Sequence, residues 1–340
     1  MSEIVAMGAC TPIGLWAEAA AAAYFSEISS IQLHPRFIDA GGERVSMAFV
    51  EAVESTREAD RMAELALAAI RDMLTQPDGG GQEADLLLSL PAYRPGFGPE
   101  DARALVEKIR GSVESAFSLG EVVTGQYDQA GGVMAIATAM NRIANGGRRH
   151  CIVVATDSYI GADSLDWIEA HQRLKTDTNP FGLIPGEAAA AMLVGPATSR
   201  NRVQVIGGGL RREIADESPG PYLGRALSRA LLDATAPLAQ RETPIRHLFV
   251  DLSGEIWRTD SFGNALTRAS SRFALGESFN VTANRVGETG AAFGVLAGIL
   301  AAVGRRTGML EGRFACICGS ATSGGARAAV LLDLGERPTK

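Results

Sequence analysis

The sequence predicts an α/β protein in which two duplicated halves form a five-layered α/β/α/β/α sandwich. Two observations carry this prediction. The same series of strand and helix patterns occurs twice along the chain, and such self-similarity indicates a repeated structural unit. The strand patterns are continuously apolar and several helices are rich in small residues, which is typical of sheets covered closely on both faces by helices. We place the halves at residues 1–200 and 201–340.

Each half opens with a predicted strand, followed after a variable stretch by an amphipathic helix. The strands cover Ile4–Cys10 and Val203–Gly209. The helices are predicted over Ala59–Met73 and Leu223–Ala234, because their apolar residues recur at the helical period. One face of each helix is therefore expected to pack on a sheet.

The middle of each half repeats a strand and a helix of small residues. The strands are predicted over Asp85–Leu90 and His247–Ser253. The helices are predicted over Gln129–Met140 and Gly290–Leu300, each entered through a turn that contains glycine. Small side chains allow close approach, so we expect these two helices to lie between the layers.

Two further apolar strands complete each half. The first follows a basic turn and is predicted over Cys151–Ala155 and Ala315–Cys318. The last strand is predicted over Gly186–Val194 in the first half and Gly324–Leu332 in the second. Every predicted element of the first half from Ile4 onwards thus has a counterpart in the second.

Composition and charge exclude several classes of function. The formal net charge is −7, whereas a nucleic-acid-binding face needs clustered lysine and arginine. The longest apolar helix candidate, residues 291–304, stops at Arg305 and Arg306, well short of a membrane span. The N-terminus has no secretory signal pattern. We therefore expect a cytoplasmic protein that contacts neither nucleic acid nor membrane.

The cysteines and histidines form no metal, disulfide or catalytic pattern. Four cysteines are too few for a disulfide framework in 340 residues, and no further ligand pair is in register with Cys316 and Cys318. Gly207–Gly209 lacks the spacing of a nucleotide-binding loop. We predict buried thiols, no metal and no cofactor. His150 and His247 are predicted at the entrances of strands, and His34 and His171 in loop or peripheral helix segments.

Three local strings, in this order and within the repeat, carry a family resemblance. They are Met7–Gly14, Asp60–Ala69 and Asn179–Ala190, the last containing Pro-Phe-Gly before Gly-Glu-Ala-Ala-Ala. Together they resemble the β-ketoacyl-acyl-carrier-protein synthases of the thiolase superfamily over nearly the whole chain. The resemblance implies the thiolase-like sandwich and a dimer.

The resemblance also implies a site at which the catalytic residues are replaced. In the family a cysteine begins a buried helix, where backbone N–H groups favour the thiolate and stabilise an oxyanion. The matching position here is Gln129, and an amide cannot form an acyl-enzyme. The positions that match the two catalytic histidines are Ser253 and Asn284, and the family's lysine matches a position near Phe279.

Two functions are compatible with this pattern. The first is a non-condensing scaffold or partner subunit, similar to a chain length factor, that forms a homodimer or a heterodimer with a synthase-like paralogue. It would bind an acyl carrier protein or a protein client. The alternative is a remodelled acyl-thioester enzyme, an acyltransferase, decarboxylase or hydrolase, that uses Asn284 with Glu255 or Glu288.

The sequence offers criteria for choosing between these functions. Glu255 and Glu288 are interpreted mainly as surface-loop or helix-capping carboxylates, since Glu288 precedes a likely helix start. The resemblance thins over residues 89–123 and 257–276, so we do not expect the usual acyl tunnel. An open channel to Gln129 would favour the enzyme. A site filled by aromatic side chains would favour the scaffold, and the candidates are Trp257, Phe279 and Tyr127.

Overall fold

Nine strands of this computed structural model form one sheet, in the order β5-β4-β6-β7-β1-β8-β11-β10-β9. The structure describes residues 1–340 except 147–149, 200–201, 214–221, 241–242, 275–278 and 337–340. The sheet has two parts, because β1 and β8 are joined by only two residue pairs, Ser2 with Val205 and Glu3 with Gln204. The predicted boundary between the halves, at residues 200 and 201, lies outside the described residues.

The first part of the sheet and its helices come from residues before 200. Their bounds are β1 (Ser2–Cys10), α1 (Ala17–Phe25), α2 (Glu58–Leu74), β4 (Glu83–Leu90), α3 (Pro99–Glu114), β5 (Ser118–Gln126), α4 (Asp128–Ala144), β6 (His150–Ser158) and β7 (Glu187–Pro196). An excursion beside this part contains β2 (Gln32–Ile38), β3 (Arg44–Met47) and α5 (Ala162–Ala170).

The second part of the sheet and its helices follow residue 201. Their bounds are β8 (Gln204–Arg212), α6 (Arg225–Ala234), β9 (His247–Val250), α7 (Ile256–Ala269), α8 (Ala283–Val286), α9 (Phe293–Thr307), β10 (Phe314–Ser320) and β11 (Ala326–Asp333).

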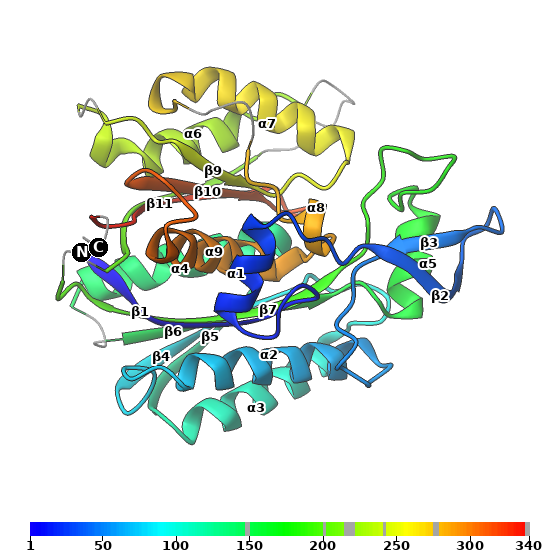
Figure 1. Cartoon of the computed structure of the whole chain (residues 1–340), viewed down its shortest axis with the longest axis horizontal. Helices are drawn as coiled ribbons and strands as arrows, with labels where there is room; N and C mark the ends of the chain where they lie inside the picture. The colour runs from blue at the N-terminus through cyan, green and yellow to red at the C-terminus, as the bar shows by residue number, and fades with distance from the viewer. Residues whose placement is uncertain (147–149, 200–201, 214–221, 241–242, 275–278, 337–340) are drawn as a thin grey trace.

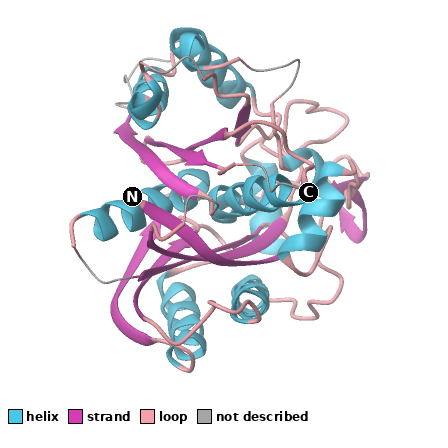
Figure 2. Ribbon diagram, turned by 60° about the vertical axis from the view of Figure 1, so that its left-hand side comes forward, coloured by secondary structure: helices cyan, strands magenta, loops and turns pink. Residues whose placement is uncertain are grey.

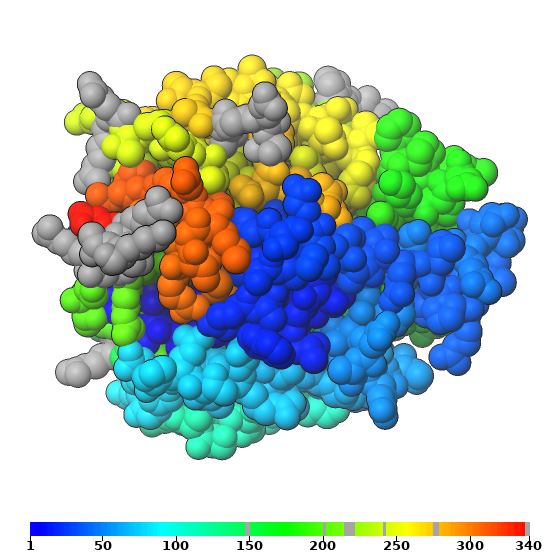
Figure 3. Space-filling view, viewed as in Figure 1, coloured from blue at the N-terminus to red at the C-terminus, as the bar shows by residue number. Residues whose placement is uncertain are grey.

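The five predicted layers are confirmed (Figure 1). Helices α2 and α3 cover one outer face, α6 and α7 cover the other, and α4 and α9 lie between the two parts of the sheet, as Figure 2 shows from a second direction. Three hydrophobic clusters fill the spaces between the layers, the largest of them around α4 and α9. On the face seen in Figure 3, α1 and the segment after α9 cover the middle layer.

The two parts of the sheet have the same topology. β4 is parallel to β6, which is antiparallel to β7, which is antiparallel to β1. β9, β10, β11 and β8 repeat this order and these directions. Strand β5 is the addition in the first part, where it pairs in parallel with β4. The repeated strand patterns of the sequence therefore occupy equivalent places.

Several elements differ from their predicted bounds for local reasons. Helix α9 begins at Phe293, because Gly290–Ala292 forms a separate 3-10 turn. Gly290 has φ +46°, and a Cβ there would lie 1.8 Å from Asp157 Oδ2, so only glycine fits this turn. Helices α3 and α7 lie in the two segments where the family resemblance thins.

Other predictions about composition can be compared with the described residues. All four cysteines are free and buried, as predicted. His150 and His247 stand at the start of β6 and β9, as predicted, whereas His34 lies in β2 rather than in a loop or helix. Among the described helices, none is long and apolar enough to cross a bilayer.

Candidate functional site

The start of α4 lies beside the ends of β4 and β10. Asp128 and Gln129 are the first two residues of α4, and both are buried. The Asp128 carboxylate accepts a hydrogen bond from the Ala92 N–H at 2.9 Å, which holds this turn against the end of β4. Strand β10 packs closely against the same turn, because a Cβ at Gly319 would lie 2.4 Å from the Gln129 carbonyl oxygen.

Gln129 is completely buried, with 0% of its surface exposed. Its Oε1 accepts a hydrogen bond from the Thr322 hydroxyl at 3.2 Å. Its Nε2 makes no hydrogen bond with the described residues. The Thr322 oxygen in turn accepts a hydrogen bond from Arg258 Nη2 at 3.2 Å. The position that matches the family's cysteine is therefore closed by β10, Thr322 and an arginine.

Arg258 occupies the centre of this site, and its side chain is only 1% exposed. It forms an ion pair with Asp251, at the end of β9, and donates to the Ser320 carbonyl oxygen at 2.6 Å. Asp251 Oδ2 also accepts a hydrogen bond from the Ser320 N–H at 2.7 Å. The Trp257 ring lies 4.4 Å from the guanidinium carbon, so the cation is also covered by an aromatic face.

Ser253 and Glu255 join the same network. The Ser253 hydroxyl donates to Glu255 Oε2 at 3.1 Å, and that oxygen lies 3.6 Å from Arg258 Nη2. Arg173 Nε donates to Glu255 Oε1 at 2.8 Å. Glu255 was interpreted as a surface-loop or helix-capping carboxylate. It is the N-cap residue of α7, but its side chain makes no capping hydrogen bond and is buried between two arginines, so the surface-loop alternative was wrong.

These arginines determine the protonation of Glu255. Burial by itself raises the pKa of a carboxyl, but the hydrogen bond from Arg173 and the charges of Arg258 and Arg173 outweigh burial and lower the pKa of Glu255. The carboxylate is thus ionised and already paired at neutral pH. Such a group is a poor general base, because taking up a proton would break its ion pairs.

Asn284 lies outside this network. It is exposed on the short helix α8, and its backbone carbonyl accepts a hydrogen bond from the Ser29 hydroxyl at 3.4 Å. In the same helix Val286 is buried, so α8 turns one side to the core and carries Asn284 on the other. The structure therefore brings Gln129 and Ser253 into one network and leaves the third predicted position at the surface.

Glu288 caps the turn that leads into α9. Its Oε1 accepts a hydrogen bond from the Gly290 N–H at 2.8 Å, in agreement with the predicted helix-capping role. The side chain is fully buried, and burial raises its pKa to about 7 despite the charge of Arg258 and the hydrogen bond from Gly290. Glu288 is therefore the predicted site carboxylate whose proton affinity lies closest to neutrality.

A second buried ion-pair group was missed by sequence reasoning. Arg94 pairs with Glu58, the first residue of α2, and with Asp157 at the end of β6, 2.7 Å away. Asp157 Oδ2 also accepts the Ala291 N–H at 2.8 Å. Asp157 follows an apolar strand and could have been singled out on that ground. Arg94 lies in a loop without a motif, and nothing local in the sequence indicates its burial.

The aromatic candidates for filling the site behave differently from one another. Trp257 packs over Arg258, with Arg327 5.8 Å away from its ring. Phe279 is 38% exposed and makes an edge contact with Phe262, and Tyr127 is 45% exposed. The site is thus filled mainly by ion-paired side chains, with Trp257 as the one predicted aromatic that covers them.

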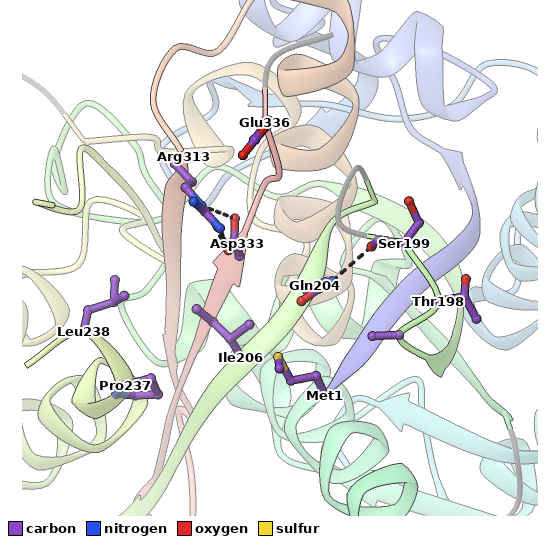
Figure 4. A pocket seen from close by; sticks show the side chains of 11 residues that line it. Met1, Thr198, Ser199, Gln204, Ile206, Pro237, Leu238, Arg313, Asp333 and Glu336 are labelled. Carbon is purple, nitrogen blue, oxygen red and sulfur yellow. Dashed lines mark hydrogen bonds and ion pairs between the residues drawn. The ribbon is translucent and has the colours of Figure 1, made fainter. Parts of the chain in front are cut away.

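Pockets of substantial size lie elsewhere among the described residues. One of about 540 Å³ opens at the opposite ends of the strands, between Met1, Gln204 and Asp333 (Figure 4). Others of about 530 Å³ and 460 Å³ lie beside the start of α2 and beside Thr11. Within the described chain, the linings of these three pockets include none of Gln129, Ser253 and Asn284.

Comparison with solved structures places ketosynthases and chain length factors among the structural neighbours. A type II PKS acyl-carrier protein in complex with its ketosynthase matches with a TM-score of 0.76 at 13% identity, over 98% of each chain. The ishigamide ketosynthase/chain length factor matches with a TM-score of 0.75 at 15% identity, over 98% of each chain. A ketosynthase in complex with its chain length factor from Xenorhabdus doucetiae has a TM-score of 0.71 at 13% identity, over 98% of this chain and 97% of that chain.

These likenesses show the fold, which is the thiolase-like fold of the ketosynthases. At such low identity they do not assign a function to any residue of this site. Neither a protein-family model nor a curated protein sequence matches the chain.

Proposed function

We propose that this chain is a ketosynthase-like protein that does not condense acyl groups and acts as a binding or partner subunit, in the manner of a chain length factor. The observation that carries the proposal is the closed environment of Gln129. A glutamine amide is not a nucleophile, and here it is packed under Thr322 and Arg258, where a thioester carbonyl would have to approach.

The surrounding charges support the same function. The carboxylates of Asp251 and Glu255 form ion pairs with arginines. They are therefore not free to transfer protons, whereas a condensing enzyme needs groups that transfer protons or stabilise an oxyanion. Asn284, which the resemblance matches to a catalytic histidine, is exposed at some remove from this network. A binding role requires none of these groups to react.

Strand β5 offers a surface for a partner. Among the described strands it pairs with β4 alone, so its nine residues form one outer edge of the sheet. An edge strand presents unpaired backbone N–H and C=O groups that can pair with another chain. We propose that β5 joins a second copy of the chain or a synthase-like paralogue, with an acyl carrier protein or a protein client bound by the resulting dimer.

The condensing function can be tested by intact-protein mass spectrometry. We expect neither an adduct nor thiol release when the protein is incubated with malonyl- and acyl-thioesters, because Gln129 is neither reactive nor accessible. An active ketosynthase serves as the positive control. The variants are Gln129→Ala and, as a matched control at an exposed position, Gln32→Ala.

Turnover of a thioester would contradict the proposal, and the variants would then show which part of the chain is responsible for the reaction. Loss of turnover in Gln129→Ala but not in Gln32→Ala would place chemistry at the start of α4. Loss in Glu288→Gln would support the alternative, a remodelled acyl-thioester enzyme, because Glu288 has a pKa of about 7 and could act as an acid or base.

The proposed dimer predicts that charge on β5 weakens association. Thr124 is exposed on β5, three residues from Glu121, so Thr124→Asp adds a second negative charge to the edge. Each like-charge pair across two strands costs about 0.2–1 kcal/mol, and two facing copies carry the substitution, so we expect the dissociation constant to rise several-fold at low salt. Sedimentation equilibrium measures this constant, and Thr124→Val is the neutral control. Equal constants for Thr124→Asp and wild type would exclude β5 as the interface.

A further inference from the structure

The turn between β10 and β11 presents backbone hydrogen-bond donors to solvent. This β10–β11 turn consists of Thr322, Ser323, Gly324 and Gly325, and the first three of these residues are exposed. None of the four N–H groups of the turn donates a hydrogen bond to the described part of the chain. Gly324 and Gly325 have φ of +67° and +71°. Turns that contain such left-handed residues can hold successive N–H groups around an anion.

Arg327 lies at the base of the β10–β11 turn, and only 8% of its surface is exposed. Its Nη1 donates to the carbonyl oxygens of the two residues that flank the turn, Ala321 at 3.1 Å and Ala326 at 2.9 Å. Its Nε is enclosed and has no hydrogen-bond partner among the described residues. Its Nη2 also makes no hydrogen bond with them, but this nitrogen is not enclosed. Nη2 is therefore the nitrogen of Arg327 that a ligand can reach.

The positive charge of Arg327 is only partly compensated. Among the described residues, the one carboxylate within 4 Å of its side chain is that of Glu213, at 3.9 Å from Nε. This carboxylate already accepts a hydrogen bond from the Ala226 N–H at 3.1 Å. Burial and the charge of Arg258 lower the pKa of Arg327, and the attraction of Glu213 and Asp251 does not outweigh them. An anion beside Arg327 would stabilise its charged form.

Two further arginines contact the same turn. Arg212, exposed at the end of β8, donates from its Nε to the Gly324 carbonyl oxygen at 3.1 Å. Arg258 donates to the Thr322 hydroxyl at 3.2 Å, but its charge is paired with that of Asp251. The free N–H groups thus belong to a turn that is held by positively charged side chains.

Aromatic rings lie beside this turn. The Trp257 ring is 5.8 Å from the guanidinium carbon of Arg327. The Tyr222 ring lies 6.3 Å from the Trp257 ring, and Tyr222 is 52% exposed. An organic group attached to an anion at the turn therefore has an aromatic surface to pack on.

We propose that the β10–β11 turn and Arg327 bind a phosphate group, through the N–H groups of the turn and Nη2 of Arg327. A phosphate group has more oxygens than a carboxylate, so it can accept hydrogen bonds from several N–H groups and from an arginine at once. It also supplies the negative charge that Arg327 lacks. The phosphate is either free or part of an ester whose organic group packs on Tyr222 and Trp257. This site goes beyond the proposed partner function and does not require access to Gln129.

Titration calorimetry of the full chain at low salt tests the proposal with inorganic phosphate, phenyl phosphate and phenol. We expect both phosphates to bind and phenol not to bind, because phenol has the ring without the charge. Binding is expected to weaken at high salt, since part of the site is exposed. Several-fold tighter binding of phenyl phosphate than of inorganic phosphate would identify an ester as the ligand, and equal affinities would identify free phosphate.

Matched variants locate the bound phosphate. Arg327→Gln removes a charged donor and is expected to weaken the binding of inorganic phosphate about tenfold or more. Arg229→Gln changes an exposed arginine of α6 away from the turn, and we expect it to leave the affinity unchanged. Equal affinities of these two variants would overturn the proposal, as would the absence of binding up to about 10 mM of either phosphate.

A variant with increased affinity keeps the proposal testable if Arg327→Gln does not fold by circular dichroism. Glu213→Gln removes the negative charge that lies 3.9 Å from Arg327, so it is expected to strengthen phosphate binding several-fold at low salt. Misfolding does not produce such a gain. Glu311→Gln, at an exposed position, is the control and is expected to bind as the wild type does. Equal affinities of Glu213→Gln and Glu311→Gln would show that the phosphate does not lie beside Arg327.

Discussion

Replacing Arg258 with methionine is expected to lower the free energy of unfolding by about 3–5 kcal/mol. Both partners of the Arg258–Asp251 ion pair are buried, so the variant leaves an uncompensated carboxylate in the interior. The carbonyl of Ser320 and the hydroxyl of Thr322 lose their donors at the same time. Denaturant unfolding followed by circular dichroism measures the loss.

Two comparisons identify the cause of this loss. Arg306→Met removes an arginine that is half exposed and paired with Glu18 at the surface, and we expect a loss of about 1 kcal/mol or less. The double variant Arg258→Met with Asp251→Asn also removes the unpaired charge of Asp251. It is expected to recover part of the lost free energy of unfolding. A loss for Arg258→Met as small as that for Arg306→Met would show that the ion pair does not hold the site closed.

The second large effect is expected where α4 and α9 cross. A Cβ at Gly294 would lie 2.4 Å from the Val133 N and 2.7 Å from Val133 Cγ2. Backbone atoms cannot yield to such an overlap without separating the helices. Gly294→Ala is therefore expected to cost about 3 kcal/mol or more, although alanine is the better helix former by about 1 kcal/mol. Thermal unfolding of the variant measures the cost.

Gly263→Ala is the matched control for this substitution. Gly263 lies on the exposed side of α7, and a Cβ there would meet nothing within 4 Å. Only helix propensity changes, so we expect a gain of about 0.5–1 kcal/mol. Equal stabilities of Gly294→Ala and Gly263→Ala would contradict the close crossing of α4 and α9.

Local patterns were sufficient to predict the fold. The apolar strand over 151–155 and its counterpart over 315–318 became β6 and β10, which have equivalent neighbours in the sheet. Continuous apolar strands can be buried on both faces only in a layered structure, so their number and order limit the possible architectures. Helix α7 had no counterpart among the sequence predictions; its segment is one of the two where the family resemblance thins.

The candidate site was predicted less completely. The sequence placed Gln129 at the start of a small-residue helix, and in the fold this residue is buried in the first turn of α4. Asn284 was assigned to the site because its sequence neighbourhood resembles that of the family's second catalytic histidine. Such a resemblance does not show that Asn284 is exposed in the folded chain. Glu255 was interpreted as a surface-loop or helix-capping carboxylate, because a short polar string after a strand usually lies in solvent. It does stand at the start of α7, but its side chain is buried.

The sequence by itself determined the two-part sandwich, the burial of the four cysteines and the presence of a glutamine at the helix start. Hydrophobic periodicity and repetition are local properties, and they can be detected without knowing which segments meet. Only the tertiary structure decided that the side chains of Arg258 and Arg94 are buried and that the side chain of Arg173 is largely covered. Burying a charged side chain is costly unless a group of opposite charge is buried with it. Here the partners are Asp251, Glu255 and Asp157, which are distant in sequence from most of the arginines they pair with. Local sequence patterns do not show which distant residues come into contact.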